Sequence, residues 1–164
     1  MRSSIEALVT HDLEINGTQG ADKFDFRGLT SVDGTLVVNG GGGADVMVGS
    51  AFADDLRGGN ARDILIGGAG NDTLSGGRHG DVYVFAGGFG ADTITDFGDR
   101  PSDQDIIKLV GYGKVKASGF DAWKADHVGT DANGNVLITL GSDTITLSGF
   151  KDVGKIGYDD FLFA

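Results

Sequence analysis

Six aspartates recur at a nearly constant spacing through the middle of the chain, and their carboxylates are the groups best suited to chemistry. From Gly40 the sequence falls into frames of nine residues, with glycine first, aspartate sixth and an apolar residue eighth. The sixth places are Asp45, Asp54, Asp63, Asp72, Asp81 and Asp92, the last after a two-residue insertion at Phe85 and Ala86. Carboxylates and turn carbonyls are the oxygen ligands that Ca²⁺ prefers. The spacing therefore predicts a calcium-binding repeat.

The nine-residue frame is too short for a helix and its connection, but it holds a tight turn and a short strand. Successive side chains of a strand point to opposite faces, so the eighth residue of each frame enters a core. Successive frames would alternate between two sheets, and two frames would make one coil. We predict an all-β fold with one core row of Met47, Leu65 and Tyr83 and a facing row of Leu56, Leu74 and Ile94.

Stacked coils would place aspartates of like charge side by side along two edges of the fold. Such rows, at a coil spacing of about 4.8 Å, repel strongly unless a cation lies between them. We therefore predict Ca²⁺ between turns two frames apart, with about four to five ions in all. The bridging carboxylate pairs would be 45/63, 63/81, 54/72 and 72/92. The turn residues in the predicted ligand set are Gly41, Gly43, Gly59, Gly68, Gly70, Asn71 and Gly77.

Three further aspartates are weaker candidates for the same role. An isolated frame, GTQGADKFD at residues 17–25, puts Asp22 in the sixth place, where an ordinary turn is an equal alternative. Asp96 and Asp105 follow the last frame and would close a further site. The other acidic residues around Pro101 fit a solvated loop.

Composition restricts the classes of function. The chain has 164 residues, with 30 Gly, no Cys and a formal net charge of -11. The excess of 24 acidic over 13 basic residues disfavours nucleic-acid binding, which needs a basic face. No apolar run approaches the ~20 residues of a transmembrane helix, and the N-terminus lacks the apolar core of a signal peptide. Without cysteine no disulfide can form, so a secreted chain would need another means of stabilising its fold.

The frame matches GGxGxDxUx, the repeat of the repeats-in-toxin (RTX) family, in which U is a large apolar residue. GGAGNDTLS at 67–75 matches at every specified place, whereas Phe52, Ala61 and His79 replace the fourth-place glycine of other frames and would constrain their turns. The resemblance implies a right-handed parallel β-roll, a calcium-binding nonapeptide solenoid. It also implies a non-catalytic module of a secreted, extracellular protein that folds on calcium binding outside the cell.

The segments after the frames resemble the C-terminal modules of serralysin-type proteases and mannuronan C5-epimerase R-modules. Residues 92–97, followed by 105–109, carry this resemblance, and residues 159–164 resemble the apolar terminus that RTX proteins present to type I secretion machinery. We accordingly divide the chain into an N-terminal entry segment (1–39), the β-roll (40–95) and a β-rich C-terminal cap (96–164).

Local patterns predict the elements of this cap. Residues 136–140 and 144–147 alternate around a short turn and predict a hairpin. Asn133-Gly134 predicts a second hairpin turn rather than an EF-hand loop, because glycine stands in the fourth place and no glutamate stands in the twelfth. A short helix from Phe120 to Trp123 is an open alternative. The aromatic rings of Trp123, Tyr112 and Tyr158 are expected to pack the cap rather than stack on sugars.

Two other functions stay open. An accessory domain like an R-module would bind an anionic polysaccharide such as alginate, with candidate contacts at Arg57, Arg62, Arg78 and Lys108. Those four residues occupy different places in their frames, so they need not share a face. A complete enzyme is disfavoured, because no catalytic motif is present and no region outside the repeats is long enough for a catalytic domain.

Overall fold

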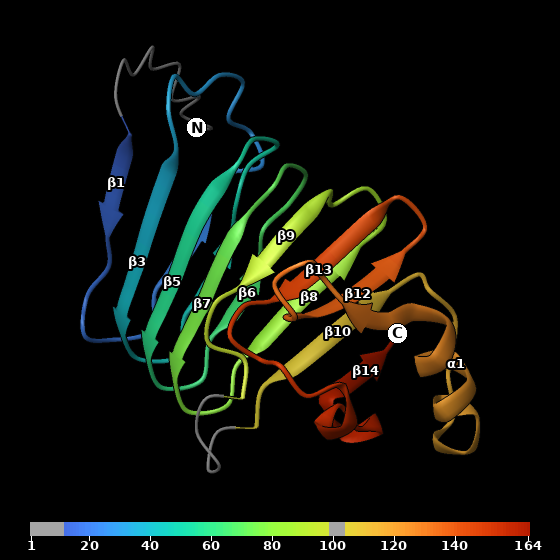
Figure 1. The fold of residues 1–164 in the computed structure, drawn as a ribbon. Helices are drawn as coiled ribbons and strands as arrows, with labels where there is room; N and C mark the ends of the chain where they lie inside the picture. The colour runs from blue at the N-terminus through green and yellow to red at the C-terminus, as the bar shows by residue number, and fades with distance from the viewer. Residues whose placement is uncertain (1–11, 99–103) are drawn as a thin grey trace.

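The computed structural model describes residues 12–98 and 104–164. Within these ranges strands dominate and form two sheets (Figure 1), so the all-β prediction is confirmed. The sequence features noted at the extreme N-terminus and around Pro101 lie outside the described residues.

The two sheets are built mainly from parallel strands. In spatial order, the eight-stranded sheet contains β1 (Leu13–Asn16), β3 (Leu36–Gly42), β5 (Asp54–Asn60), β7 (Thr73–Arg78), β9 (Ala91–Ile94), β13 (Asp143–Leu147), β12 (Val136–Leu140) and β11 (Val128–Thr130). The six-stranded sheet contains β14 (Phe161–Phe163), β10 (Ile106–Val110), β8 (Val82–Ala86), β6 (Ile64–Ile66), β4 (Val46–Val48) and β2 (Lys23–Asp25). Pairing is parallel throughout the second sheet and from β1 to β13 in the first. The chain therefore winds as a parallel β-roll.

The eighth-place residues form the two predicted core rows. Met47, Leu65 and Tyr83 are in register in the six-stranded sheet. The facing row of the eight-stranded sheet aligns Leu56, Leu74 and Ile94. All six side chains are fully buried, which confirms the two rows and the alternation of frames between sheets.

The parallel ladder continues beyond the frames in both directions. Phe24 on β2 pairs with Met47, and Ile107 on β10 pairs with Tyr83, so the first core row is longer than the repeats alone. Val38 and Leu147 extend the second row in the same way. The division of the chain at residues 39 and 95 stays a prediction, because the same two sheets run through all three parts.

The C-terminal residues cover one end of the roll, where a solenoid would otherwise expose its core. Strands β12 and β13 form the predicted hairpin, and β11 and β12 pair around the loop that contains Gly134. Helix α1 (Phe120–His127) lies beside β11 and β12, and short 3₁₀ helices span Ala117–Gly119, Val153–Lys155 and Tyr158–Asp160. Trp123 packs against Phe120, Phe161 and Phe163, which confirms its structural role in the cap. No helix in the described part of the chain is long and apolar enough to span a membrane.

Candidate metal centre

The sixth-place aspartates gather along the two edges where the chain turns from one sheet to the other. The first turn edge, which leads into the six-stranded sheet, carries Asp22, Asp45, Asp63, Asp81 and Asp105. The second turn edge, which leads into the eight-stranded sheet, carries Asp54, Asp72 and Asp92. Each glycine-rich turn ends at or next to its aspartate, and a strand begins within one residue of it. The fold therefore brings together all six aspartates of the frames, and it adds Asp22 and Asp105 to the first row.

Neighbouring aspartates of a row are joined by one repeated contact. The backbone N–H of each aspartate donates to Oδ1 of the aspartate one coil later, with N···O distances between 2.7 and 3.0 Å. The four carboxylate pairs predicted from the sequence all show this contact. Two further pairs, 22/45 and 81/105, show it at the ends of the first turn edge.

The second carboxylate oxygen of four aspartates has no protein partner. Oδ2 of Asp45, Asp63, Asp72 and Asp92 is buried without a hydrogen bond. A buried charged oxygen without a partner is costly, so these groups call for a cation or a proton. Burial raises the pKa of Asp63 to about 6 and the pKa of Asp72 and of Asp92 to about 7. Burial also raises the pKa of Asp45.

The first-place glycines leave room beside these oxygens. A Cβ on Gly58 would collide with Oδ2 of Asp63 and would lie 2.6 Å from the carbonyl oxygen of Gly76, one coil later. A Cβ on Gly40 would meet Asp45 and the Gly58 carbonyl oxygen in the same way. Each such turn therefore holds a carboxylate oxygen and a carbonyl oxygen around one small space that only glycine leaves open. This combination is the donor set of a hard divalent cation such as Ca²⁺.

The other turn residues predicted as ligands shape the backbone of the turns. Gly41, Gly59, Gly68 and Gly77 in the second place, and Gly43 and Gly70 in the fourth, have positive φ angles. Ala61 and His79 adopt positive φ without being glycine, as expected from their fourth-place positions, whereas Phe52 does not. Asn71 accepts a hydrogen bond from the backbone N–H of Ala91 and so ties its turn to the next coil.

Two turns differ from the rest because a hydroxyl residue replaces the second-place glycine. In the turn at 49–54 the backbone N–H and the hydroxyl of Ser50 both donate to Asp54. Thr18 donates to Asp22 from the same two groups. These two aspartates each begin a row, so no earlier aspartate donates to them within the described residues. Sequence reasoning missed the role of both hydroxyl groups, although serine or threonine four residues before an aspartate was a visible signal.

The two weaker candidates after the frames occupy different places. Asp105 accepts hydrogen bonds from Asp81 and from Gly98, and it ends the first turn edge. Asp96 lies off both rows, where it accepts hydrogen bonds from Ser75, Gly76 and Gly77 and from the Tyr83 hydroxyl. Its carboxylate therefore stabilises the turn that begins at Gly76. This structural role was not predicted from the sequence.

A pocket of about 250 Å³ opens beside Asp92 on the second turn edge. Gly68 and Ala69 line it from one turn, and Gly87 and Phe89 line it from the turn that follows the insertion. The two extra residues lengthen the coil between Asp72 and Asp92, yet both aspartates stay buried.

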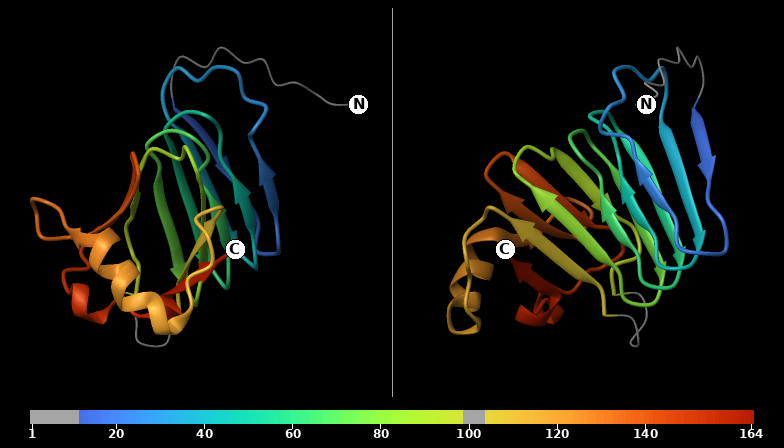
Figure 2. Two further views of the ribbon diagram at one scale, coloured as in Figure 1. Left: turned by 90° about the vertical axis from the view of Figure 1, so that its right-hand side faces the viewer. Right: turned by 180° about the vertical axis from the view of Figure 1, so that it is seen from behind.

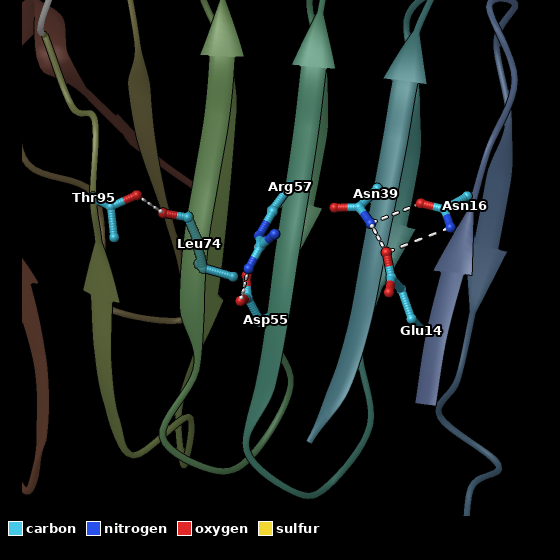
Figure 3. A network of polar contacts seen from close by, with 7 residues as sticks. All are labelled: Glu14, Asn16, Asn39, Asp55, Arg57, Leu74 and Thr95. Carbon is cyan, nitrogen blue, oxygen red and sulfur yellow. Dashed lines mark hydrogen bonds and ion pairs between the residues drawn. The ribbon is translucent and has the colours of Figure 1, made fainter. Parts of the chain in front are cut away.

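The four basic candidates for polysaccharide contact do not form one cluster. Arg57 lies on the outer face of β5 and pairs with Asp55, while Lys108 lies on β10 in the other sheet (Figure 3 shows the Arg57 pair). Arg62 donates to the carbonyl oxygen of Gly80, which lies in the turn directly after Arg78, the last residue of β7. Only Arg62 and Arg78 therefore come from neighbouring turns.

The outer face of the eight-stranded sheet around Arg57 carries other polar contacts. Asn39 donates to Glu14 and to Asn16 across β1 and β3 (Figure 3). This face is a hydrogen-bonded polar surface with both signs of charge rather than a basic one.

Comparison with known proteins agrees with the geometry of the turns. Residues 37–56 and 48–83 match the model of the RTX calcium-binding nonapeptide repeat. The resemblance to RTX repeats drawn from the sequence is therefore confirmed for this segment, whose strands belong to the parallel β-roll. No curated protein matches the chain.

The solved structures that are similar to the chain include the following two. The extracellular lipase LipA from Serratia marcescens aligns with 92% of this chain at 27% identity, with a TM-score of 0.49. The AlgE6R3 subunit of the Azotobacter vinelandii mannuronan C5-epimerase aligns with 98% of it, also at 27% identity and a TM-score of 0.49. The aligned region is 21% of the lipase chain and 83% of the epimerase subunit.

Proposed function

We propose that this chain is a non-catalytic calcium-binding module that folds when Ca²⁺ fills the two turn edges. The observation that carries the proposal is the set of four buried carboxylate oxygens without partners. Three of them, on Asp45, Asp63 and Asp72, lie beside a space that a first-place glycine leaves open. The residues that would hold the ions are the neighbouring carboxylates of each row and the glycine carbonyls of the same turns. We keep the predicted number of ions at about four to five.

The proposed switch follows from the charges of the rows. Without a cation, buried carboxylates one coil apart repel each other, and strands as short as β4 and β6, with three residues each, cannot hold the coils together. Bound Ca²⁺ would supply the missing positive charge between the coils. Its binding free energy then becomes folding free energy, as in other small domains that depend on a metal.

The conditions for this switch fit a secreted protein. Extracellular calcium modules bind with dissociation constants of about 10⁻⁴–10⁻³ M, so such sites would stay empty in the cytosol and fill outside the cell. We propose that the chain is exported by type I secretion machinery through residues 159–164 and folds on exit. Deleting residues 159–164 should stop export from a cell that carries the machinery, and unchanged export would contradict this part of the proposal.

The direct test of the module is a calcium titration followed by circular dichroism and calorimetry. We expect β-structure to appear cooperatively as Ca²⁺ is added to protein stripped with a chelator. Mg²⁺ at the same concentration is the control, because it demands a small octahedral site and should produce little structure. Full structure in excess chelator, with no change at millimolar Ca²⁺, would contradict the proposal.

Binding of an anionic polysaccharide is a second, weaker candidate. It is supported by Arg62 and Arg78 on neighbouring turns, and it is weakened by the positions of Arg57 and Lys108 on different sheets. Calorimetric titration with alginate at low salt would detect it, with Arg62→Ala and Arg78→Ala as the variants that should lose affinity. No heat of binding at low salt would remove this candidate.

A further inference from the structure

In the regular turns, the space beside each aspartate is also reached by a carbonyl oxygen of the next coil. The turns of successive coils stack along both edges of the roll (Figure 2). A Cβ on Gly40 would collide with the carbonyl oxygen of Gly58 as well as with its own aspartate. On the second turn edge, a Cβ on Gly49 would collide with the carbonyl oxygen of Gly67 and with its own aspartate. A cation in these turns would therefore meet oxygens of two kinds.

The 72/92 pair lacks this carbonyl oxygen. A Cβ on Gly67 would have three atoms of Asp72 as its nearest contacts, the third at 3.0 Å, so no carbonyl oxygen of the next coil comes as close. The first-place glycine of that next coil is Gly87, and within 4 Å a Cβ there would meet only the Tyr112 hydroxyl oxygen, at 3.9 Å. Oδ2 of Asp72 and Oδ2 of Asp92 are nevertheless buried without a hydrogen bond. The pair therefore offers a cation its carboxylates without the turn carbonyl.

The two-residue insertion explains the difference. Strand β8 continues through Phe85 and Ala86, in register with β10, so the chain turns two residues later than in a regular frame. The second half of the turn is back in register, because Gly90 pairs with Gly70 of the preceding coil. Only the first half of the turn, at Gly87, is displaced from the stack.

The displaced half-turn borders the pocket beside Asp92. The pocket has a volume of about 250 Å³ and lies between Gly68 and Ala69 on one side and Gly87 and Phe89 on the other. A cavity of this size has room for several water molecules, which need polar partners. Among the residues that line it, all within the described part of the chain, Asp92 has the only polar side chain. Water in this pocket would therefore be held chiefly by backbone groups, by Asp92 and by an ion bound to it.

The end of the first turn edge does not share this arrangement. The atoms nearest to a Cβ on Gly76 also belong to its own aspartate, Asp81. There, however, Asp96 accepts hydrogen bonds from the backbone N–H groups of Gly76 and Gly77. Because a protein carboxylate already lies over that turn, we assign the unusual site to the second turn edge alone.

We propose that the 72/92 pair is a hydrated cation site, which binds Ca²⁺ more weakly than the regular pairs and also accepts Mg²⁺. Ca²⁺ takes about six to eight oxygen ligands, so donors that the protein does not supply must be water. Mg²⁺ keeps several of its waters and is bound through one or two carboxylates, which is what this pair and its pocket offer. The inference rests on the proposed function and deepens it, because it gives one of the sites a different selectivity.

Equilibrium dialysis of the folded, Ca²⁺-saturated chain against rising concentrations of Mg²⁺ tests the proposal. We expect Mg²⁺ to displace about one Ca²⁺, whose dissociation constant should be at least ~tenfold above those of the others because fewer protein donors hold it. Circular dichroism should show that the fold is kept. Asp92→Asn should abolish this displaceable ion. Asp54→Asn, which removes the other neighbour of Asp72, is the matched variant and should instead lose an ion that Mg²⁺ does not displace.

Luminescence lifetimes of bound Tb³⁺, an ion that replaces Ca²⁺, give a second readout when they are compared in H₂O and D₂O, because they count the waters on each ion. In the unsubstituted chain we expect one ion with about two more waters than the others. Ca²⁺-dependent folding with ions that all resist Mg²⁺ equally, or that all carry the same number of waters, would overturn this inference and leave the proposed function standing. A chain that binds no Ca²⁺ would overturn both. If Asp92→Asn does not fold, the dialysis and the lifetimes of the unsubstituted chain still decide.

Discussion

The two turn edges are built from the same nine-residue frame, yet they hold different numbers of neighbouring carboxylates. The first turn edge has four neighbouring pairs of aspartates, which run from Asp22 to Asp105. The second has two, because Leu36 is in register with Asp54 at one end and Ile145 with Asp92 at the other. A carboxylate row thus ends where the adjoining coil supplies an apolar residue. The capacity for cations therefore depends on the neighbouring coils as well as on the frame.

The two edges begin alike. Thr18 satisfies Asp22 at the start of one row, and Ser50 satisfies Asp54 at the start of the other. Asp45, Asp63 and Asp72 inside the rows, and Asp92 at the end of the second row, instead keep a buried oxygen without a partner. Row-initial turns are therefore closed by the protein, whereas we propose that the turns of these four aspartates are completed by a cation.

The largest effect is expected from removing a charge shared by two pairs. Asp63→Asn should disable two of the four pairs on the first turn edge, whereas Asp72→Asn should disable both pairs on the second. Calorimetry should show a loss of about two ions in each variant, since ligand charge is a main determinant of Ca²⁺ affinity. The control is Asp55→Asn, which alters an exposed-face carboxylate paired with Arg57. An unchanged stoichiometry in both interior variants would remove the assignment of these pairs.

Substituting a first-place glycine should act on one turn of either edge. Gly58→Ala and Gly67→Ala would each drive a methyl group into Oδ2 of the aspartate of the same turn. We expect each to lower the free energy of unfolding by about 1–3 kcal/mol, as overpacking does, and to weaken calcium binding. Gly28→Ala is the control, because a Cβ there meets nothing within 4 Å. Denaturant unfolding in calcium measures the difference, and equal stability of all three variants would contradict the cramped geometry of the turns.

The pH dependence of the metal-free chain should reflect the interior aspartates of both edges. Burial raises the pKa of Asp63 to about 6 and the pKa of Asp72 to about 7, above the unfolded value of 3.8. The folded state therefore binds more protons than the unfolded state between about pH 4 and pH 7, and stability falls as pH rises through that window. In chelator, circular dichroism should show more β-structure at pH 5 than at pH 8. The opposite trend would mean that these carboxylates are not buried in the metal-free state.

The smallest effect is expected at the start of each row. Ser50→Ala and Thr18→Ala each remove one hydroxyl donor, and the backbone N–H of the same residue still reaches the aspartate. We expect a loss of about 1 kcal/mol in the free energy of unfolding and no change in calcium stoichiometry. Ser31→Ala, at an exposed position, is the control for loss of a hydroxyl. A large loss of bound calcium in either variant would show that row-initial turns are not closed by the protein alone.

The sequence predicted the frame well, because its signal is local and periodic. Glycine, aspartate and an apolar residue at fixed places were enough to assign the core rows of Met47 and Leu56 and the pairs of neighbouring aspartates. Only separate elements of the cap were predicted. Each hairpin has a local turn signal, but no local signal indicates that β13 pairs with β9 or that β14 pairs with β10.

Two other features had a visible signal that the frame analysis did not use. The seventh and ninth places alternate between apolar and polar pairs every second frame, which marks the two outer faces. Ser50 replaces the glycine that precedes Asp54 by four residues, which marks a turn closed by its own side chain. Both signals are differences between frames rather than features that all frames share.

The claim that calcium lies between the interior turns is tested most directly by a crystal structure of the chain grown in excess Ca²⁺. We predict cation density beside Oδ2 of Asp45, Asp63, Asp72 and Asp92, with each ion bonded to both carboxylates of a neighbouring pair. An intact fold with only water, or no density, at all four oxygens would contradict the claim.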